Sequence, residues 1–383
     1  MLTTGAIFSD HMVLQREKTI PVWGYADPAV SVSVSIDTET VTGSSDETGF
    51  WILYLSPKNT ARGLTLTIQG GDEKIEFHDV STGEVWFAGG QSNMELELVN
   101  SLHGESAVAG SNHSDIRFYM TPKCAVTGDE LKEREAEAGW QSPFRPSGLF
   151  YSMVQRVRPY AIRGFLYYQG EEDEAKYADY DWMMISLIRE WRSEWKDDKM
   201  PFLFVQLPMY IAKAQAVQGI DDRHWAMIRD QQMKVYKTVA NTGLAVLTDC
   251  GEFDNIHPLD KETVGFRLAL QARSKVYGEE ICADAPSIRR VDFKEGKAYA
   301  HFEHTGGFLR IQGDALSGFE IAGGDGVFYP AQGNVEMNTV TLWSEQVTAP
   351  AFLRYAWKNY CKANLHGASG LPAAPFRTDQ FSI

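Results

Sequence analysis

The chain has 383 residues, a length that corresponds to two or three domains. Hydrophobic residues make up 44% of the chain and charged residues 23%, which excludes a disordered or low-complexity protein. There are 36 Lys and Arg against 51 Asp and Glu, and the net charge of −15 disfavours nucleic acid as a partner, because such a surface repels phosphate groups.

Signals for a membrane or for secretion are not found in the sequence. No run reaches the roughly 18 apolar residues of a membrane-spanning helix, and the first residues lack a basic segment followed by a long apolar one. The four cysteines show no metal-binding or redox spacing: Cys124, Cys250, Cys282 and Cys361. We therefore expect a cytoplasmic protein with no membrane partner.

Residues 1–80 have the pattern of β-strands. Residues 30–36, VSVSVSI, alternate strictly between apolar and polar side chains, and residues 64–68, LTLTI, repeat the pattern. This alternation gives one apolar and one polar face, as in a half-buried strand. Turn sequences separate the strands at residues 26–28, 46–49 and 70–72. The region is predicted to be a β-sandwich-like accessory module.

Strands and helices alternate in residues 81–284. Short apolar runs without polar alternation are typical of strands buried on both faces, and they occur at residues 85–88, 161–168, 201–207 and 243–247. Helices are predicted at residues 177–195 and 225–239. The alternation predicts an α/β fold with a parallel sheet and helices on both faces. From residue 285 to 383 β-segments return and predict a C-terminal β-sandwich-like module.

Ser92 lies where the first buried strand is predicted to end and a helix to begin, after Gly90 and Gln91. In open α/β sheets ligands bind at the carboxyl ends of strands, and a helix N-terminus offers free N–H groups to an oxyanion. Ser92 is therefore a candidate nucleophile. The segment alone favours a simpler interpretation, a serine capping a helix after a glycine-rich turn. The G-x-S-x-G elbow of α/β-hydrolases is not indicated, because Met94 replaces its last glycine.

Asp254 and His257 form a D-x-x-H pattern in a loop after the predicted strand at residues 243–247. A serine nucleophile needs a base, and the base needs an orienting carboxylate. The spacing can place both on one turn, with the carboxylate bonding Nδ1 and Nε2 left free. The pattern alone also fits a capped helix start with a surface histidine. A strand-terminal serine followed later by this pattern strengthens the catalytic interpretation.

Gln169, Gly170 and Glu171 follow another predicted strand. The Gln side chain or the Gly N–H could donate to an oxyanion. Taken alone, the segment favours an ordinary turn between a strand and a helix.

Several motifs together resemble the sialate O-acetylesterase family of carbohydrate acetylesterases, within the SGNH-hydrolase superfamily. The similar segments occur in family order at residues 7–16, 83–86, 90–94, 168–171, 201–207, 256–258, 261, 264–269, 319–323, 353–357 and 370–377. The likeness spans nearly the whole chain. It implies an SGNH-hydrolase-like core.

The resemblance also implies roles for individual residues. Ser92 corresponds to the nucleophile, His257 to the general base and later acid, and Asp254 to the residue that orients the histidine. The oxyanion or substrate side corresponds to Gln91, Gln169, Gly170 and Glu171, with Glu171 closer to a polar-network residue than to a second base. No metal and no organic cofactor is implied.

The chain departs from the family pattern between residues 140 and 150. Relatives carry an additional stretch here with a helix, a buried strand and a Gly-Gly-Thr turn that provides an oxyanion glycine, and this sequence shows no such strand or turn. We therefore expect a shortened core. Glu172 and Asp173 replace the usual Ser-Asn, and Tyr168 replaces the usual Trp.

The function implied is a serine esterase that removes O-acetyl groups from sialate or another acetylated glycan through an acetyl-enzyme. A sialate carboxylate calls for an arginine, for which Arg163 and Arg223 are candidates. One alternative is a carbohydrate-binding or catalytically weakened relative without a complete oxyanion hole. Another is a thioesterase or lipase with an apolar acyl tunnel. The oligomeric state stays open.

Overall fold

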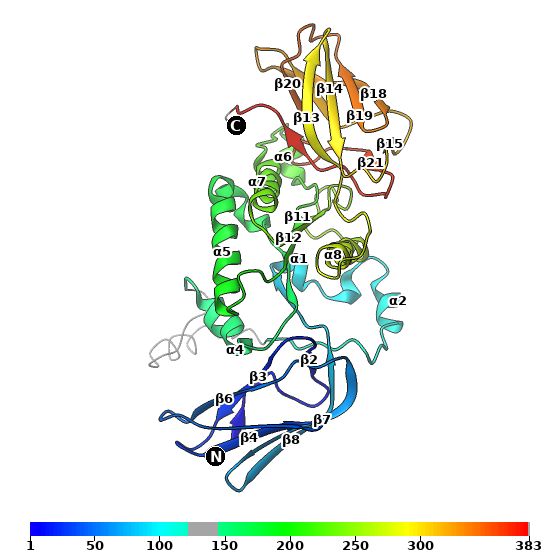
Figure 1. Cartoon of the computed structure of the whole chain (residues 1–383). Helices are drawn as coiled ribbons and strands as arrows, with labels where there is room; N and C mark the ends of the chain where they lie inside the picture. Colours follow the sequence, from blue (N-terminus) through cyan, green and yellow to red (C-terminus); the bar gives the residue numbers. More distant parts are fainter. Residues whose placement is uncertain (122–144, 382–383) are drawn as a thin grey trace. The chain divides into compact units, whose positions relative to one another are not determined.

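The computed structural model describes residues 1–121 and 145–381 (Figure 1). The chain divides into two compact units. Unit 1 consists of Met1–Phe87, Asn112–Gly164 and Trp191–Asp198, and unit 2 consists of Ala88–Ser111, Phe165–Glu190 and Lys199–Ile383. The three-module division at residues 80/81 and 284/285 stays a prediction. The predicted shortening of the core falls partly on residues 122–144, outside the described residues, and Cys124 lies there too.

Unit 1 contains two β-sheets that share one hydrophobic core. The larger sheet has the strand order β2-β8-β7-β4-β5 and the smaller one β1-β3-β6. In β4 (Ser31–Ile36), Val32, Val34 and Ile36 are buried in this core, while the serines between them are more exposed. The other strands are β1 (Thr3–Thr4), β2 (Val13–Gln15), β3 (Ile20–Tyr25), β5 (Glu39–Ser44), β6 (Phe50–Leu55), β7 (Ala61–Gly70) and β8 (Glu73–Gly83). The alternating sequence pattern predicted β4 and β7 correctly.

Glu84, which follows β8, is held by arginines within unit 1. Arg163 donates from Nε to Oε2 at 2.7 Å and from Nη2 to Oε1 at 2.9 Å. Arg16 donates to Oε1, and Gln15 donates to Oε2 at 3.3 Å. Burial alone would raise the pKa of Glu84, but the hydrogen bonds from Arg163 and Arg16 outweigh it and hold the pKa at about 2, below the usual 4.5.

We expect Glu84→Gln to lower the free energy of unfolding by about 1 kcal/mol at pH 7, after allowance for solvent screening. A carboxylate whose pKa is lowered on folding stabilises the folded state above its unfolded pKa. The difference between wild type and variant is therefore full above pH 4.5 and disappears as the pH falls toward 2. Urea unfolding at several pH values measures it. Glu47→Gln, at an exposed position, is the control, and a difference independent of pH would contradict the assignment.

The central sheet lies mostly in unit 2 and has the strand order β12-β11-β10-β9. Its strands are β9 (Trp86–Gly90), β10 (Gly164–Tyr168), β11 (Phe202–Gln206) and β12 (Thr242–Val246). The pairs β10–β11 and β11–β12 are parallel, as the alternation of strands and helices predicted. Every residue of β11 and of β12 is buried, which agrees with apolar runs that lack polar alternation.

The expectation that β9 is buried on both faces is wrong. Its residues are exposed or half-buried. The physical reason is its position, because β9 is the end strand of this sheet in the described part of the chain.

Helices α7 (His224–Thr238) and α8 (Lys261–Lys275) both pack against β11 and β12. In β11, the Gln206 side chain donates to the Arg229 carbonyl of α7. Leu203 lies three residues earlier in β11. The side chains of Leu203 and of Gln271 in α8 both lie close to Gly243 of β12. Because side chains alternate along a strand, the two helices cover opposite faces. The predicted arrangement of helices on both faces is therefore found.

The remaining helices are mostly short. They are α1 (Ser92–Glu95), η1 (Leu98–Asn100), α2 (Gly104–Ala109), η2 (Phe150–Val154), α4 (Gln155–Val157), η3 (Glu171–Asp179), α5 (Tyr180–Glu194) and α6 (Lys213–Val217). Among them, α5 agrees with the predicted helix at residues 177–195. None of the helices in the described residues combines the length and the apolar character needed to cross a bilayer.

The C-terminal β-structure of unit 2 has three sheets, with orders β13-β14-β19-β18, β17-β16-β20-β22 and β15-β21. The two larger sheets share a core that includes Ala300, Val340, Ile321 and Leu353. The strands are β13 (Ser287–Lys294), β14 (Lys297–Glu303), β15 (Leu309–Ile311), β16 (Phe319–Ala322), β17 (Phe328–Pro330), β18 (Gln332–Glu336), β19 (Thr339–Trp343), β20 (Phe352–Tyr355), β21 (Leu365–Gly367) and β22 (Phe376–Arg377). Two facing sheets with one core match the expected sandwich-like arrangement.

Candidate active site

Ser92 and His257, which are 165 positions apart in the sequence, meet in unit 2. Ser92 is the first residue of α1, directly after β9 and Gln91, and its side chain is exposed. His257 lies in the loop between β12 and α8. The Oγ of Ser92 is 2.7 Å from Nε2 of His257. The structure thus brings together the predicted nucleophile and the predicted base.

Gly90 gives the chain the close approach that places Ser92 beside β10. Its φ of +152° lies in a region that side chains disfavour, and a Cβ here would meet the Tyr168 carbonyl oxygen at 2.0 Å. The next residue, Gln91, donates its N–H to the same carbonyl at 3.0 Å. A glycine is therefore required directly before the turn that begins α1.

The loop that carries His257 is organised by its own polar side chains. Glu252 accepts from the Leu259 N–H at 2.7 Å and from the Asn255 amide at 2.9 Å. Asn255 Oδ1 in turn accepts from the His257 backbone N–H at 3.0 Å. Sequence reasoning missed Glu252, because one acidic residue among several in a loop carries no recognisable spacing.

Asp254 lies three residues before His257, with a left-handed φ of 58°. Its Oδ1 accepts from the Lys213 N–H at 2.7 Å. Among the described residues no hydrogen bond joins Asp254 to His257. The orienting role of Asp254 therefore stays a prediction.

Gln91 and Gly170 lie next to each other beside Ser92. The side-chain carbonyl of Gln91 is 3.5 Å from the Gly170 N–H and 3.4 Å from the Glu172 N–H, both at the start of η3. Gly170 has a φ of +146°, and a Cβ there would press on Gln232 and Ile228 of α7. The contacts of Oε1 with the two N–H groups orient the Gln91 side chain. The Nε2 of Gln91 has no acceptor among the described residues.

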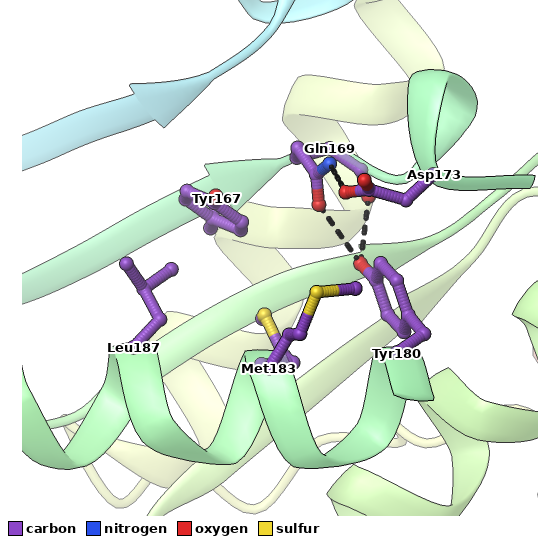
Figure 2. A pocket seen from close by; sticks show the side chains of 7 residues that line it. Tyr167, Gln169, Asp173, Tyr180, Met183 and Leu187 are labelled. Carbon is purple, nitrogen blue, oxygen red and sulfur yellow. Dashed lines mark hydrogen bonds between the residues drawn. The ribbon is translucent and has the colours of Figure 1, made fainter. Parts of the chain in front are cut away.

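Gln169 faces a small pocket of about 160 Å³ (Figure 2). Its amide donates to Asp173 at 2.5 Å, and Tyr180 Oη lies 3.2 Å from its Oε1. Both polar ends of the Gln169 side chain are thus engaged with these neighbours. The pocket is lined by Tyr167, Gln169, Asp173, Tyr180, Met183, Met184 and Leu187, and neither Ser92 nor His257 is among them. A role of Gln169 toward an oxyanion stays a prediction.

Glu171 takes part in a buried polar network next to Ser92. The Asn93 amide donates to Glu171 Oε1 at 2.6 Å and to the Ile256 carbonyl at 2.9 Å, while Lys261 Nζ donates to Asn93 Oδ1 at 2.5 Å. Glu171 Oε2 is buried without a partner among the described residues. Burial raises the pKa of Glu171 and lowers the pKa of Lys261. Sequence reasoning missed Asn93 and Lys261 as site residues.

The start of the loop that carries His257 is held by an ion pair whose arginine is buried. Arg267 of α8 donates to both carboxylate oxygens of Asp249, at 2.6 and 2.7 Å, and also to the Val246 carbonyl at 2.8 Å. His366 of β21 lies 3.5 Å from Asp249 Oδ2. Burial by itself would raise the pKa of Asp249, but the hydrogen bonds from Arg267 outweigh it and hold the pKa well below its usual value.

We expect Arg267→Ala to reduce the free energy of unfolding by about 2 kcal/mol, because it removes a buried side chain together with its hydrogen bonds to Asp249 and to the Val246 carbonyl. Arg273→Ala is the matched control on the same helix. Its ion pair with Glu279 is exposed and screened by water, so the expected loss is much smaller than for Arg267→Ala. Urea unfolding monitored by tryptophan fluorescence compares the two. Equal losses would show that the pair with Asp249 stabilises the fold no more than an exposed ion pair does.

The two arginines considered for a sialate carboxylate are engaged elsewhere. Arg163 pairs with Glu84 and Glu17 in unit 1. Arg223 donates to the Trp357 carbonyl and lies 3.6 Å from Glu320. A substrate carboxylate would have to compete with these partners.

Known proteins that are similar to this chain are carbohydrate esterases. The family model for carbohydrate esterase, sialic acid-specific acetylesterase, matches residues 120–271. The sialate O-acetylesterase of Homo sapiens is 24% identical, covering 97% of this chain and 91% of the human protein, and that of Mus musculus is 23% identical, covering 97% and 93%. The crystal structure of a carbohydrate acetylesterase from Xanthomonas citri is 31% identical over the whole of both chains, with a TM-score of 0.87.

An exposed serine that is hydrogen-bonded to a histidine is the arrangement that nucleophilic hydrolases use to attack esters. Full-length likeness to a carbohydrate acetylesterase, together with the family match, assigns the ester class. The chain therefore belongs to the sialate O-acetylesterase family of carbohydrate esterases and is a carbohydrate O-acetylesterase.

Proposed function

We propose that the chain hydrolyses O-acetyl sugars by a serine mechanism through an acetyl-enzyme. The observation that carries this proposal is the 2.7 Å contact between Ser92 Oγ and His257 Nε2. A neutral imidazole at this distance can accept the hydroxyl proton as the oxygen attacks.

In the first half of the reaction, Ser92 Oγ bonds to the acetyl carbonyl carbon and His257 takes the hydroxyl proton. The C–O bond to the sugar then breaks, and the same proton passes from His257 to the departing sugar oxygen. In the second half, water gives its proton to His257 and attacks the acetyl carbon. The Ser92 hydroxyl is restored with the proton from His257, and acetic acid leaves and ionises to acetate in solution.

Two hydrogen-bond donors beside Ser92 support stabilisation of the oxyanion. The Ser92 backbone N–H lies in the first turn of α1 and has no acceptor among the described residues. The Gln91 Nε2 is likewise without an acceptor there, because only the carbonyl end of this side chain is engaged. An oxyanion 2.7–3.1 Å from such donors is the arrangement that speeds acyl transfer.

The substrate is proposed to be sialate or another glycan that carries O-acetyl groups. The relatives named above are sialate O-acetylesterases and a carbohydrate acetylesterase. The net charge of −15 and the engaged Arg163 and Arg223 favour a neutral acetylated sugar over an anionic one.

The test compares p-nitrophenyl acetate with the butyrate and octanoate esters, and then measures acetate release from O-acetylated sialate and from acetylated xylan. We expect hydrolysis to fall as the acyl chain lengthens and acetate to be released from at least one of the two glycans. Preference for the octanoate ester would favour a lipase or thioesterase instead. No rate above that of Ser92→Ala would overturn the serine mechanism.

A further inference from the structure

The polar network around Asn93, next to Ser92 and His257, has no role in the reaction scheme above. Asn93 is 4% exposed and directly follows Ser92. Its amide donates to the carbonyl of Ile256, the residue directly before His257, at 2.9 Å. One hydrogen bond thus connects the neighbour of the nucleophile to the neighbour of the base.

We propose that Asn93 is a positioning residue that sets the separation between Ser92 and His257. The inference rests on the proposed function, because it assigns the residue that aligns the same pair. No other described hydrogen bond joins α1 to the backbone beside His257. A misplacement of about 1 Å at reacting atoms can cost about 10²-fold in rate.

The orientation of the Asn93 amide is determined by its other two partners. Lys261 is a donor only, so the Asn93 atom that it contacts at 2.5 Å must be the oxygen. The amide nitrogen then has two hydrogens for two acceptors, Glu171 Oε1 at 2.6 Å and the Ile256 carbonyl. These three hydrogen bonds can form together in only one orientation of the amide, so they hold the Asn93 side chain in that orientation.

Glu171 and Lys261 thus serve as supports for Asn93. Glu171 is 7% exposed and belongs to η3, while Lys261 is the first residue of α8 and also lies 5.2 Å from the centre of the Tyr168 ring. Because η3 packs against α7, and α8 packs against β11 and β12, these two side chains hold Asn93 in a fixed position. Asn93 in turn transmits that fixed position to the backbone at Ile256.

A pair of substitutions separates positioning from simple stability. N93D cannot donate to Ile256 and places a carboxylate against Glu171, so both kcat and thermal stability should fall. In N93D with E171Q, the glutamine amide donates to the new carboxylate and Lys261 keeps its partner, so Tm should return to near the wild-type value. The bond to Ile256 is still missing, and kcat should remain about 10²-fold below wild type with KM unchanged.

The control is N100A, at an exposed asparagine of η1, which should change neither kcat nor Tm. Recovery of both Tm and kcat in the double variant would overturn the proposal, because the network would then matter only for stability. Absence of wild-type hydrolysis would instead count against the proposed function.

A second measurement does not depend on the substrate. Crystal structures of the wild type and N93A give the distance between Ser92 Oγ and His257 Nε2 directly. We expect the 2.7 Å contact in the wild type and a separation beyond about 3.5 Å in the variant. An unchanged contact in N93A would overturn the positioning role, whatever ester the protein hydrolyses.

Discussion

Replacement of Ser92 by alanine is expected to reduce kcat for aryl acetate hydrolysis by about 10⁴-fold or more, because no covalent intermediate can form. KM should change little, since the methyl side chain leaves the surrounding side chains in place. Initial rates of p-nitrophenol release, corrected for spontaneous hydrolysis, measure the effect. Mass spectrometry after rapid acid quenching should detect an acetylated wild-type chain and none in the variant.

Ser111→Ala is the matched control for this experiment. Ser111 is an exposed serine whose hydroxyl donates to the Val108 carbonyl at 2.7 Å. The Ser111→Ala variant should be as active as the wild type. A Ser92→Ala variant that keeps most of its activity would mean that another group attacks the ester.

His257→Ala is expected to cause a loss of similar size, about 10⁴-fold or more, because serine then lacks the base that accepts its proton at 2.7 Å. The double variant Ser92→Ala, His257→Ala should be no slower than either single variant, since residues that act as a unit are strongly non-additive. His113→Ala, at an exposed histidine, is the control and should remain active. Multiplicative losses in the double variant would show that the two residues do not act on the same step.

Strands with simple burial patterns could be predicted from sequence. The alternation at residues 30–36 follows from β4 having one face on the core and one toward solvent. The apolar runs within β11 and β12 follow from helices on both faces of these strands. In both cases the environment repeats along the strand, so a short window of sequence reports it.

Other elements could not be predicted, because their neighbours decide their environment. The buried face of α8 includes Arg267, which donates to Asp249, and Gln271, whose Nε2 donates to the Ala283 carbonyl. Two polar residues at buried positions interrupt the apolar stripe that marks a helix. The apolar residues of β9 suggested full burial, but a place at the end of the sheet depends on which strands pair.

The candidate site likewise contains residues that could be predicted from sequence and residues that could not. Ser92 and His257 stand out because their chemistry requires particular residue types after strands. Asn93 and Lys261 have ordinary residue types at unremarkable spacings, and their roles arise only from contacts between α1, η3 and α8. Such contacts depend on the folded chain, and no local pattern encodes them.

The contacts of the loop that carries His257 with the C-terminal β-structure limit how this enzyme can be shortened or recombined. His366 of β21 reaches Asp249 at the start of the loop, and the ring of Tyr360 lies 5.7 Å from that of Phe253 within it. A truncation after residue 284 would remove both contacts. The smallest active fragment must therefore retain these strands, and a chimera that exchanges them would need to supply equivalent side chains to keep the loop in register.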